Sequence, residues 1–406
     1  MRRAMSFLLT VALLPVLAVV SPSNSAASAA RSERDVVPHL GYATFEHPGV
    51  LESGSQLDLA REKVRAGKEP WKSAYAQMRR SSYASLTWIT YPRADVDCGS
   101  RSVPDHGCLD ETNAAMGAYT DALIWYVGGD HRYAAKAIQH MDRWARVIRT
   151  HTNKNARLQT GWAGDMWARA AEIMRYSDAG WSSASIQRVA GMLRTVYLPT
   201  LLKGALTANG NWELIMTDAA IGISVFNNDH TSFDRAIALW RRRVPAYFYL
   251  TSDGPLPDSP GGAIRGRAAI VKYWQGQSRF VNGLSQETCR DFLHAGWGLD
   301  AATHTAETAR IQGVDLYGEE RDRLTKAMEF HAQYQNGAKV PAWLCGGKLN
   351  LGLGDVLEVG YNEYHNRLGI PLPQSKILID RSRPSGADYF LAWESLTHSD
   401  GRLLLP

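Results

Sequence analysis

Apolar residues recur at helical spacing through most of the chain, and short polar stretches separate one apolar segment from the next. These segments end at Gly, Asp, Asn or Ser, the residue types that stop one helix and cap another. The central helices predicted in this way span residues 112–127, 133–148, 162–176, 185–202, 212–226 and 233–249. Helices of similar length with short connectors favour helical hairpins packed side by side in a single all-α domain.

The flanking segments follow the same pattern less regularly. Four more helices are expected, at residues 55–66, 71–82, 285–312 and 317–336. Residues 251–282 lack the helical spacing of apolar residues, and a polar loop of this length is usually functional or disordered. Residues 340–406 are richer in Gly and Pro. We expect loops and one or two helices there, and a small separate strand domain is the alternative.

The first thirty residues have the pattern of a secretory signal peptide. Arg2 and Arg3 precede an apolar run, Phe7–Val20, which small residues follow. This run is too short to span a bilayer comfortably, which argues against a membrane anchor. We therefore expect residues 1–30 to be removed and residues 31–406 to be secreted, with no membrane association afterwards.

Four cysteines fit an exported protein. Cys98 and Cys108 enclose nine residues rich in turn formers, so a disulfide there would staple a surface loop. Cys289 and Cys345 would then pair by elimination, although four cysteines allow three pairings. A zinc site is the rival interpretation, but the chain has no CxxC or HExxH spacing.

Charge and motifs exclude several classes of protein. The net charge is +5 and is spread along the chain, whereas a nucleic-acid-binding protein would concentrate basic residues on one face. An excess of this size is compatible with a polyanionic polysaccharide as partner. The sequence also lacks GxSxG, a Walker sequence and GxGxxG after a strand.

The stretch QETCRDFLHAGW, residues 286–297, contains the strongest candidates for chemistry. Read as a helix, it places Gln286, Arg290, His294 and Trp297 on one stripe, at i, i+4, i+8 and i+11. Such a stripe would suit a sugar acid, with arginine for the carboxylate, histidine for a proton and tryptophan for the sugar face. The alternative is a buried helix whose polar side chains satisfy one another.

Three further places hold candidate residues. Asn211 and Trp212 open a helix, where Asn211 is either an ordinary N-cap or an amide donor to a substrate. Trp162 is one of thirteen tryptophans, a type whose flat face packs against sugars but which is more often core. Tyr361, Tyr364 and His365 lie together in YNEYHNRLG. They could supply an acid and a base, or form a local hydrogen-bonded cluster.

Blocks of sequence that carry a family resemblance cover most of residues 85–400. They read GWAGDMWARAAEIMRY (161–176), NGNWELIMTDAAIGISVF (209–226), TSDGPLP (251–257), QETCRDFLHAGWGL (286–299), AETARIQGVDLY (306–317), WLCGGKLNL (343–351), YNEYHNRLG (361–369) and WESLTH (393–398). Together they resemble the alginate-lyase-type polysaccharide lyases, and among these the secreted bacterial mannuronan and glucuronan lyases. The resemblance implies an (α/α) toroid, an incomplete barrel of helical hairpins, over residues 31–406.

The resemblance also implies a reaction and roles for residues. Polyuronate lyases remove the C5 proton of a uronate and expel the oxygen at C4, so they must neutralise the carboxylate, and they need no cofactor or metal. Neutralisation is expected from Asn211 and Arg290, with help from Gln286, while His294 is a neutraliser or the base. An acid and a base, typically tyrosine or histidine, complete such a site, and Tyr361 is counted among the expected catalytic residues. The expected sugar contacts are Trp162, Trp212, Trp297, Tyr364 and His365.

One departure from the family pattern bears on activity. Arginine is followed at +7 by a tyrosine in the family, whereas this chain has Trp297, and an indole cannot transfer that proton. Either another residue acts, or the chain is weakened or altered as a lyase. The residues considered for this transfer are Tyr273, Tyr361, Tyr364, His294 and His365. A non-catalytic uronate-binding protein and an (α/α)-barrel glycoside hydrolase are the alternative functions. The sequence does not predict the oligomeric state.

Overall fold

A computed structural model describes residues 44–400 of the chain. The chain divides into two compact units, residues 1–38 and 39–406, and all the described residues belong to the second. The expected signal peptide lies outside the described residues.

Helices make up most of the described chain, in agreement with the all-α prediction. They are α1 (Gly54–Arg65), α2 (Trp71–Arg80), α3 (Cys108–Gly128), α4 (His131–Val147), α5 (Ala156–Arg175), α6 (Ser183–Met192), α7 (Leu198–Leu201), α8 (Gly210–Phe226), α9 (His230–Arg243), α10 (Arg267–Tyr273), α11 (Phe292–Ile311), α12 (Leu316–Glu319), α13 (Arg321–Gln335), α14 (Glu358–Tyr361), α15 (Pro373–Ser382) and α16 (Glu394–Thr397).

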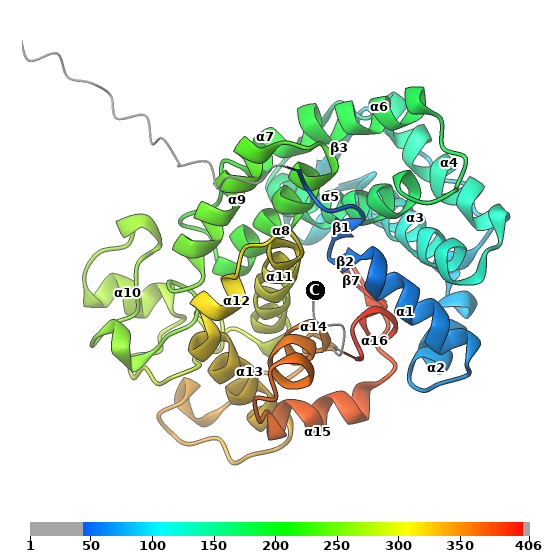
Figure 1. Cartoon of the computed structure of the whole chain (residues 1–406). Helices are drawn as coiled ribbons and strands as arrows, with labels where there is room; N and C mark the ends of the chain where they lie inside the picture. Colours follow the sequence, from blue (N-terminus) through cyan, green and yellow to red (C-terminus); the bar gives the residue numbers. More distant parts are fainter. Residues whose placement is uncertain (1–43, 401–406) are drawn as a thin grey trace, which may run out of the picture. The chain divides into compact units, whose positions relative to one another are not determined.

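Four long helices, α3, α5, α8 and α11, lie side by side in that order (Figure 1). Each is buried on nearly every face, as their apolar and small residues predict. The approach of α5 to α8 is close, because a Cβ added at Gly161 would lie 2.9 Å from Ile215 Cγ2. The partners α4 and α9 are buried on one face only and pack outside α3 and α8. This arrangement of hairpins confirms the (α/α) toroid.

Segments from both ends of the described chain complete the ring of inner helices. α14 packs on α11, α16 on α14, and α1 on both α16 and α3. The strands β1 (Gly49–Val50), β2 (Glu52–Ser53) and β7 (Leu391–Ala392) lie inside this ring (Figure 1). The C-terminal segment therefore belongs to the same body, and among the described residues the alternative of a separate strand domain is wrong.

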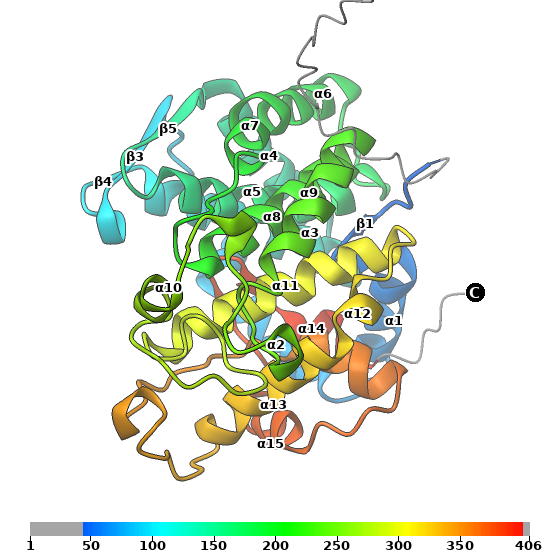
Figure 2. The same cartoon turned by 90° about the vertical axis from the view of Figure 1, so that its left-hand side faces the viewer.

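The remaining strands are short. β3 (Asp95–Cys98) pairs antiparallel with β4 (Asp105–His106) and parallel with β5 (Thr150–Thr152), and β6 (Ala387–Asp388) forms a hairpin with β7. The three-stranded sheet and the loop that carries α10 lie toward the same side in Figure 2. This loop corresponds to the expected irregular segment 251–282, in which the helix α10 was not predicted.

Two predicted helices differ from the structure. The helix expected over 285–312 begins at Phe292, because Asp291 caps it and residues 286–290 form turns. The helix expected over 185–202 contains a π-helical turn, Leu193–Tyr197, between α6 and α7. Helical periodicity survives both features, which is why the pattern alone did not reveal them.

Both predicted disulfides are present. Cys98 pairs with Cys108 beside β3 and β4, and Cys289 pairs with Cys345, joining the turns before α11 to a segment 56 residues later. The zinc interpretation of the cysteines is therefore wrong.

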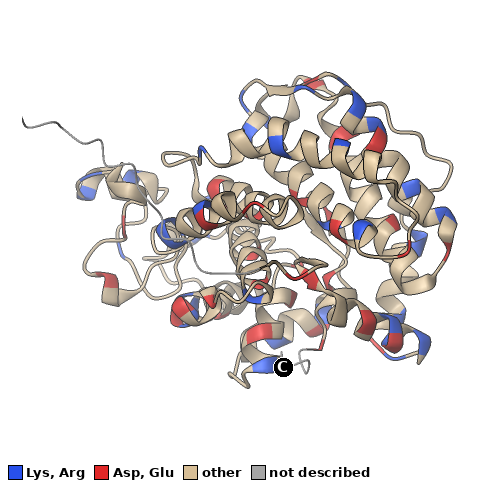
Figure 3. Ribbon diagram, turned by 45° about the horizontal axis from the view of Figure 1, so that its top comes forward, with Lys and Arg blue, Asp and Glu red and all other residues tan. Residues whose placement is uncertain are grey.

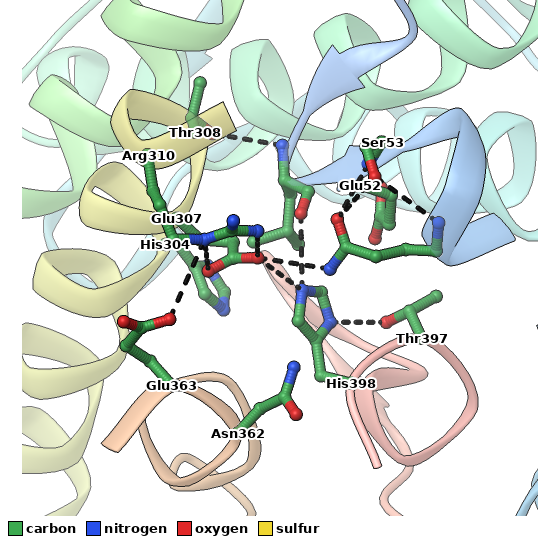
Figure 4. Close-up of polar contacts among 12 residues, drawn as sticks. Glu52, Ser53, His304, Glu307, Thr308, Arg310, Asn362, Glu363, Thr397 and His398 are labelled. Atoms are coloured by element: carbon green, nitrogen blue, oxygen red, sulfur yellow. Dashed lines mark hydrogen bonds and ion pairs between the residues drawn. The ribbon is translucent and has the colours of Figure 1, made fainter. Parts of the chain in front are cut away.

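A buried polar network fixes α11 to segments from both ends of the described chain (Figure 4). Glu307 accepts hydrogen bonds from Arg310 at 2.7 Å, Arg367 at 2.8 Å and Gln56 at 3.1 Å. Burial opposes ionisation of Glu307, but Arg367 and Arg310 outweigh it and hold its pKa well below the ordinary value. His398, which follows α16, lies within hydrogen-bonding distance of the Leu51 carbonyl, at 3.2 Å. This network closes the ring with charge as well as apolar packing.

Charged residues of both signs are spread over the described part of the chain. Lys and Arg positions are interspersed with Asp and Glu positions along the helices (Figure 3). Within residues 44–400, no helix has the length and apolar character needed to cross a membrane.

Candidate active site

The start of α11 organises the candidate site. The Asp291 carboxylate accepts the backbone N–H of His294 at 2.8 Å, the ordinary contact of an N-cap. Because Gln286 and Arg290 precede the helix, the predicted four-residue helical stripe is wrong. Arg290 and His294 nevertheless meet, while Gln286 turns away from them.

Gln286 is buried and its amide is used within the protein. Its Oε1 accepts the backbone N–H of Gly210 at 2.9 Å, and its Nε2 donates to the carbonyl of Tyr273 at 2.5 Å. These bonds fix the start of α8, where Asn211 lies. The hydrogen bonds of Gln286 thus fit the alternative in which buried polar side chains satisfy one another, and do not indicate contact with a substrate.

Glu287 joins the two predicted neutralising residues. One carboxylate oxygen accepts from Asn211 Nδ2 at 2.7 Å and from the Tyr247 hydroxyl at 3.0 Å, and the other accepts from Arg290 Nη1 at 2.7 Å. Asn211, Glu287 and Tyr247 are fully buried. Burial, and then the neighbouring Glu287, raise the pKa of Tyr247 well above its ordinary value, so it remains a hydrogen-bond donor. Asn211 therefore lies beside Arg290 but contacts it through Glu287.

Arg290 is the accessible cation of this cluster, with 32% of its side chain exposed. Its Nη2 lies 2.8 Å from His294 Nε2, and because a guanidinium only donates, this imidazole nitrogen accepts. His294 Nδ1 then carries the proton and donates to Asp291 at 2.6 Å. Burial opposes ionisation of Asp291, but hydrogen bonds from His294 outweigh it and lower the pKa of this carboxyl. The result is a cluster of carboxylate, imidazole and guanidinium, in which Arg290 Nε also lies 3.7 Å from Asp291 and N–H donors of Arg290 are left over.

Aromatic rings lie on the other side of His294. The imidazole is 5.4 Å from the ring of Trp297, which is 5.7 Å from Trp162 and 5.2 Å from Tyr389. Trp162 and Trp297 are buried, and no described residue accepts a hydrogen bond from either indole N–H. Trp212 is half-buried and packs against the core. The predicted Trp162 and Trp297 thus come together beside His294.

A hollow of about 250 Å³ lies against this aromatic group. Leu293 and Trp297 from α11 line it together with Asp388 and Leu391 from the β6–β7 hairpin. The hairpin was missed in the sequence because its strands are two residues long and leave no alternating pattern. Glu287 and Tyr247 were also missed, because Glu287 is defined by partners 76 and 40 residues earlier in the chain, Asn211 and Tyr247, and such contacts leave no local signal.

The predicted residues Tyr361, Tyr364 and His365 form a separate group. The Tyr364 hydroxyl donates to the carbonyl of Tyr317 at 3.1 Å, His365 Nδ1 lies 2.9 Å from the Ile370 carbonyl, and Tyr361 stacks on His365 at 4.6 Å. Among residues 44–400, no hydrogen bond, ion pair or ring contact joins them to Arg290 or Asn211.

Tyr273, another candidate for proton transfer, is also committed elsewhere. Its hydroxyl donates to the Ala208 carbonyl at 2.7 Å and accepts from Arg243 at 2.9 Å. His294 is the member of the predicted set of proton carriers that touches Arg290.

Two groups of buried side chains in the described part could hold a metal ion. Each group brings its potential ligand atoms within 4.8 Å: Asp165, Asp218 and His304, and Asp300, His304 and Glu394. The guanidinium of Arg169 lies 2.6 Å from Asp165, 3.3 Å from Asp218 and 2.7 Å from His304. Because Arg169 already supplies positive charge there, we assign these side chains to the structural core.

Sequence comparison places the chain in a class of enzymes, the polysaccharide lyases. The family model described as Alginate lyase matches residues 58–260, half of the 406-residue chain. The chain belongs to the alginate lyase family, as the sequence resemblance predicted. The matched segment contains Trp162, Asn211 and Trp212, whereas Arg290 and His294 lie beyond it. A search of curated proteins gave no match.

Solved structures of alginate lyases share the fold. Alginate lyase A1-III from Sphingomonas species A1 matches with a TM-score of 0.57 at 15% identity, covering 82% of this chain and 92% of that one. A variant of the same lyase complexed with a tetrasaccharide matches with a TM-score of 0.57 at 16% identity, over 81% and 90% of the two chains. An alginate lyase from Bacteroides ovatus matches with a TM-score of 0.53 at 13% identity, over 87% and 99%.

Proposed function

We propose that this chain is an exported lyase that cleaves a β-1,4-linked polyuronate, either mannuronan (alginate) or glucuronan, by β-elimination. The observation that carries the proposal is the partly exposed Arg290, which Glu287 holds on one side and His294 contacts on the other. Family membership and the complex of a related lyase with a tetrasaccharide support it. The signal-peptide pattern of residues 1–30 supports export.

Arg290 is suited to the central electrostatic task. The C5 proton of a uronate is weakly acidic while the adjacent carboxylate is an anion, and fixed donors on that carboxylate stabilise the charge that develops as the proton leaves. Glu287 fixes one edge of the guanidinium, and Asn211 and Tyr247 fix Glu287. In this proposal Asn211 positions the cation instead of contacting the sugar acid.

His294 is the base in the proposed reaction. Asp291 holds its Nδ1 proton, which leaves Nε2 as the acceptor, the arrangement that orients a general base. In the free protein Arg290 donates to this nitrogen. A substrate carboxylate that draws Arg290 onto itself would release Nε2 to take the C5 proton. The proposal gives Tyr361 no part in this step, because it packs on His365 elsewhere.

The first experiment asks whether the bond is cleaved by elimination. Purified protein is incubated with polymannuronate, polyguluronate, glucuronan and a neutral β-1,4-glucan, and both ultraviolet absorbance and reducing ends are followed. We expect absorbance from a conjugated double bond with at least one polyuronate and none with the glucan. Reducing ends without absorbance would indicate a hydrolase, and binding without either product would indicate a non-catalytic uronate-binding protein.

The second experiment removes the neutralising cation. Arg290→Ala should lower kcat/KM on the cleaved polyuronate by about 100-fold or more, the typical effect of deleting one donor to a developing oxyanion. Arg194→Ala, at an exposed arginine on the π-helical turn, is the control and should behave as wild type. A folded Arg290→Ala protein with wild-type turnover would refute the role of Arg290.

A further inference from the structure

The proposed elimination leaves one proton unassigned, and the inference below rests on that proposed function. When the C4–O bond breaks, its electron pair stays on the departing sugar oxygen, which needs a proton to leave as a hydroxyl. His294 is occupied with the C5 proton, and the indole of Trp297 has no useful acidity. Tyr273 and Tyr361 have their places elsewhere in the fold. A phenol that the sequence pattern did not select lies beside Trp297 and can donate this proton.

Tyr389 lies at the turn of the β6–β7 hairpin, against the two tryptophans. Its ring is 4.4 Å from that of Trp162 and 5.2 Å from that of Trp297. The side chain is half-buried, and no described residue shares a hydrogen bond with its hydroxyl. The adjacent Asp388 lines the same hollow as Trp297 and Leu293. A phenolic hydroxyl that shares no hydrogen bond with a described residue thus belongs to a ring next to Trp297, and the ring of Trp297 is also 5.4 Å from the imidazole of His294.

The backbone at Tyr389 is held in an unusual conformation. Its φ is +54°, in the left-handed region that bulky residues rarely adopt. Arg169, which is fully buried, donates from Nη1 to the carbonyl of the next residue, Phe390, at 3.2 Å. Strain of this kind persists only where the surroundings over-determine it, and it clusters at functional sites. A buried guanidinium that grips the turn provides that constraint.

We propose that Tyr389 is the general acid of the reaction. His294 Nε2 takes the proton from C5, the C4–C5 double bond forms, and the C4–O bond breaks. The departing oxygen takes the phenolic proton of Tyr389. Water then carries the proton from His294 back to the Tyr389 phenolate, so the enzyme ends as it began and no water is added to the sugar.

The electrostatic surroundings of Tyr389 favour its acting as a proton donor to the leaving oxygen. Burial, and then the charges of Asp388 and Asp105, raise the pKa of Tyr389 above its ordinary value. A phenol that stays protonated at neutral pH is fitted to donate a proton to the leaving group, whereas a base at C5 would have to be deprotonated first. The β6–β7 hairpin therefore places a tyrosine next to position 297, where α11 itself has a tryptophan.

The test compares Tyr389→Phe with wild type on the polyuronate that wild type cleaves. We expect kcat to fall by about 100-fold or more with little change in KM, because the ring packing is kept and only the hydroxyl is lost. A uronate with a nitrophenolate leaving group at C4, which departs without a proton, should be cleaved by Tyr389→Phe within a few-fold of the wild-type rate. A purely structural role would slow both substrates equally, and that result would overturn the proposal.

Two further variants sharpen the result. Tyr334→Phe removes the hydroxyl of a buried tyrosine that does not line the hollow, and should leave activity unchanged. Adding Trp297→Tyr to Tyr389→Phe should restore part of the lost activity, since the two rings are 5.2 Å apart. If wild type is active and Tyr389→Phe turns over at the same rate, the role of Tyr389 is refuted and the proposed function is not. Absence of any unsaturated product from wild type would refute the proposed function and this role together.

Discussion

At the scale of single residues, one carboxylate, that of Asp291, both caps α11 and orients the imidazole of the candidate site. It caps α11 through the backbone of His294 and binds the imidazole of the same residue at 2.6 Å. Glu287 likewise fixes both Asn211 and Arg290. Because each acid binds more than one partner, local folding and the alignment of the cation and base are coupled.

The variant Asp291→Asn separates the capping of α11 from the stabilisation of the His294 imidazole. Asparagine is as good an N-cap as aspartate, so we expect the melting temperature to stay close to that of wild type. The neutral amide no longer stabilises an imidazolium, so we expect kcat to fall by about 10-fold to 1,000-fold. Thermal melts and initial rates on the cleaved polyuronate measure the two effects.

Asp229→Asn is the matched control, because Asp229 caps α9 with no histidine at stake. It should preserve both stability and rate. Equal rates in wild type and Asp291→Asn would show that His294 does not need its carboxylate partner.

The sequence predicted part of the site at this scale. Arg290 and His294 carry chemistry that one face of a local segment reveals, and they do meet. Glu287 could not be separated from ordinary helix acids, because its role depends on Asn211, which lies 76 residues earlier. Tyr389 was invisible for a similar reason, since only the packing of the hairpin brings it to Trp297.

At the scale of elements, the turns before α11 are held by a covalent bond and by the backbone. Cys289 is joined to Cys345, and the Phe292 N–H donates to the Asn350 carbonyl at 2.8 Å. Arg290 lies between these two attachments. Helical periodicity continues across Asp291, so the sequence predicted a longer helix, whereas the N-cap and these attachments set its true start.

Removing this disulfide should be more damaging than removing the other. Cross-linking residues 56 apart restricts the unfolded chain more than cross-linking residues 10 apart. We expect Cys289→Ser/Cys345→Ser to lower the free energy of unfolding by roughly 2–5 kcal/mol, and Cys98→Ser/Cys108→Ser by about 1–2 kcal/mol less. Denaturant titrations of both double variants measure the difference.

Activity distinguishes the two bonds further, because Arg290 follows Cys289 directly in the chain. Loss of the Cys289–Cys345 bond should also lower kcat in the folded protein, while loss of the Cys98–Cys108 bond should not. An identical response of the two variants would argue against a role for the disulfide in holding Arg290.

At the scale of the whole folded unit, closure of the ring depends on buried charge. Glu307 on α11 gathers Arg310, Arg367 and Gln56, and the last comes from the first described helix. The sequence predicted the toroid from helix lengths, spacing and family blocks. It could not predict this closure, because partners more than 250 residues apart leave no mark on local patterns.

This network makes stability depend on pH in a defined direction. The pKa of Glu307 in the folded state lies well below the ordinary value of 4.5. Its stabilising contribution is therefore fully present above the ordinary pKa and is lost as the pH falls through the lower, folded-state value. We expect the melting temperature to fall on acidification, and Glu307→Gln to flatten that dependence.

At neutral pH, Glu307→Gln should cost roughly 3–5 kcal/mol, since it removes the buried anion that Arg310 and Arg367 share and leaves both guanidinium groups with Glu363 alone. Asp322→Asn is the control, because it removes only an exposed pair with Lys326 and should change stability by less than about 1 kcal/mol. A melting temperature of Glu307→Gln equal to that of wild type would contradict the assignment.

The hydrogen bond from Arg169 to the Phe390 carbonyl has a consequence for engineering. A guanidinium that recognises a backbone oxygen is indifferent to the side chain attached to it. Position 388, at the end of β6, could accept other side chains while the path of the hairpin stays fixed, whereas inserting or deleting one residue would displace the Phe390 carbonyl. Libraries that randomise Asp388, which lines the hollow, at constant length and with Tyr389 kept are therefore the natural route to new sugar preferences on this scaffold.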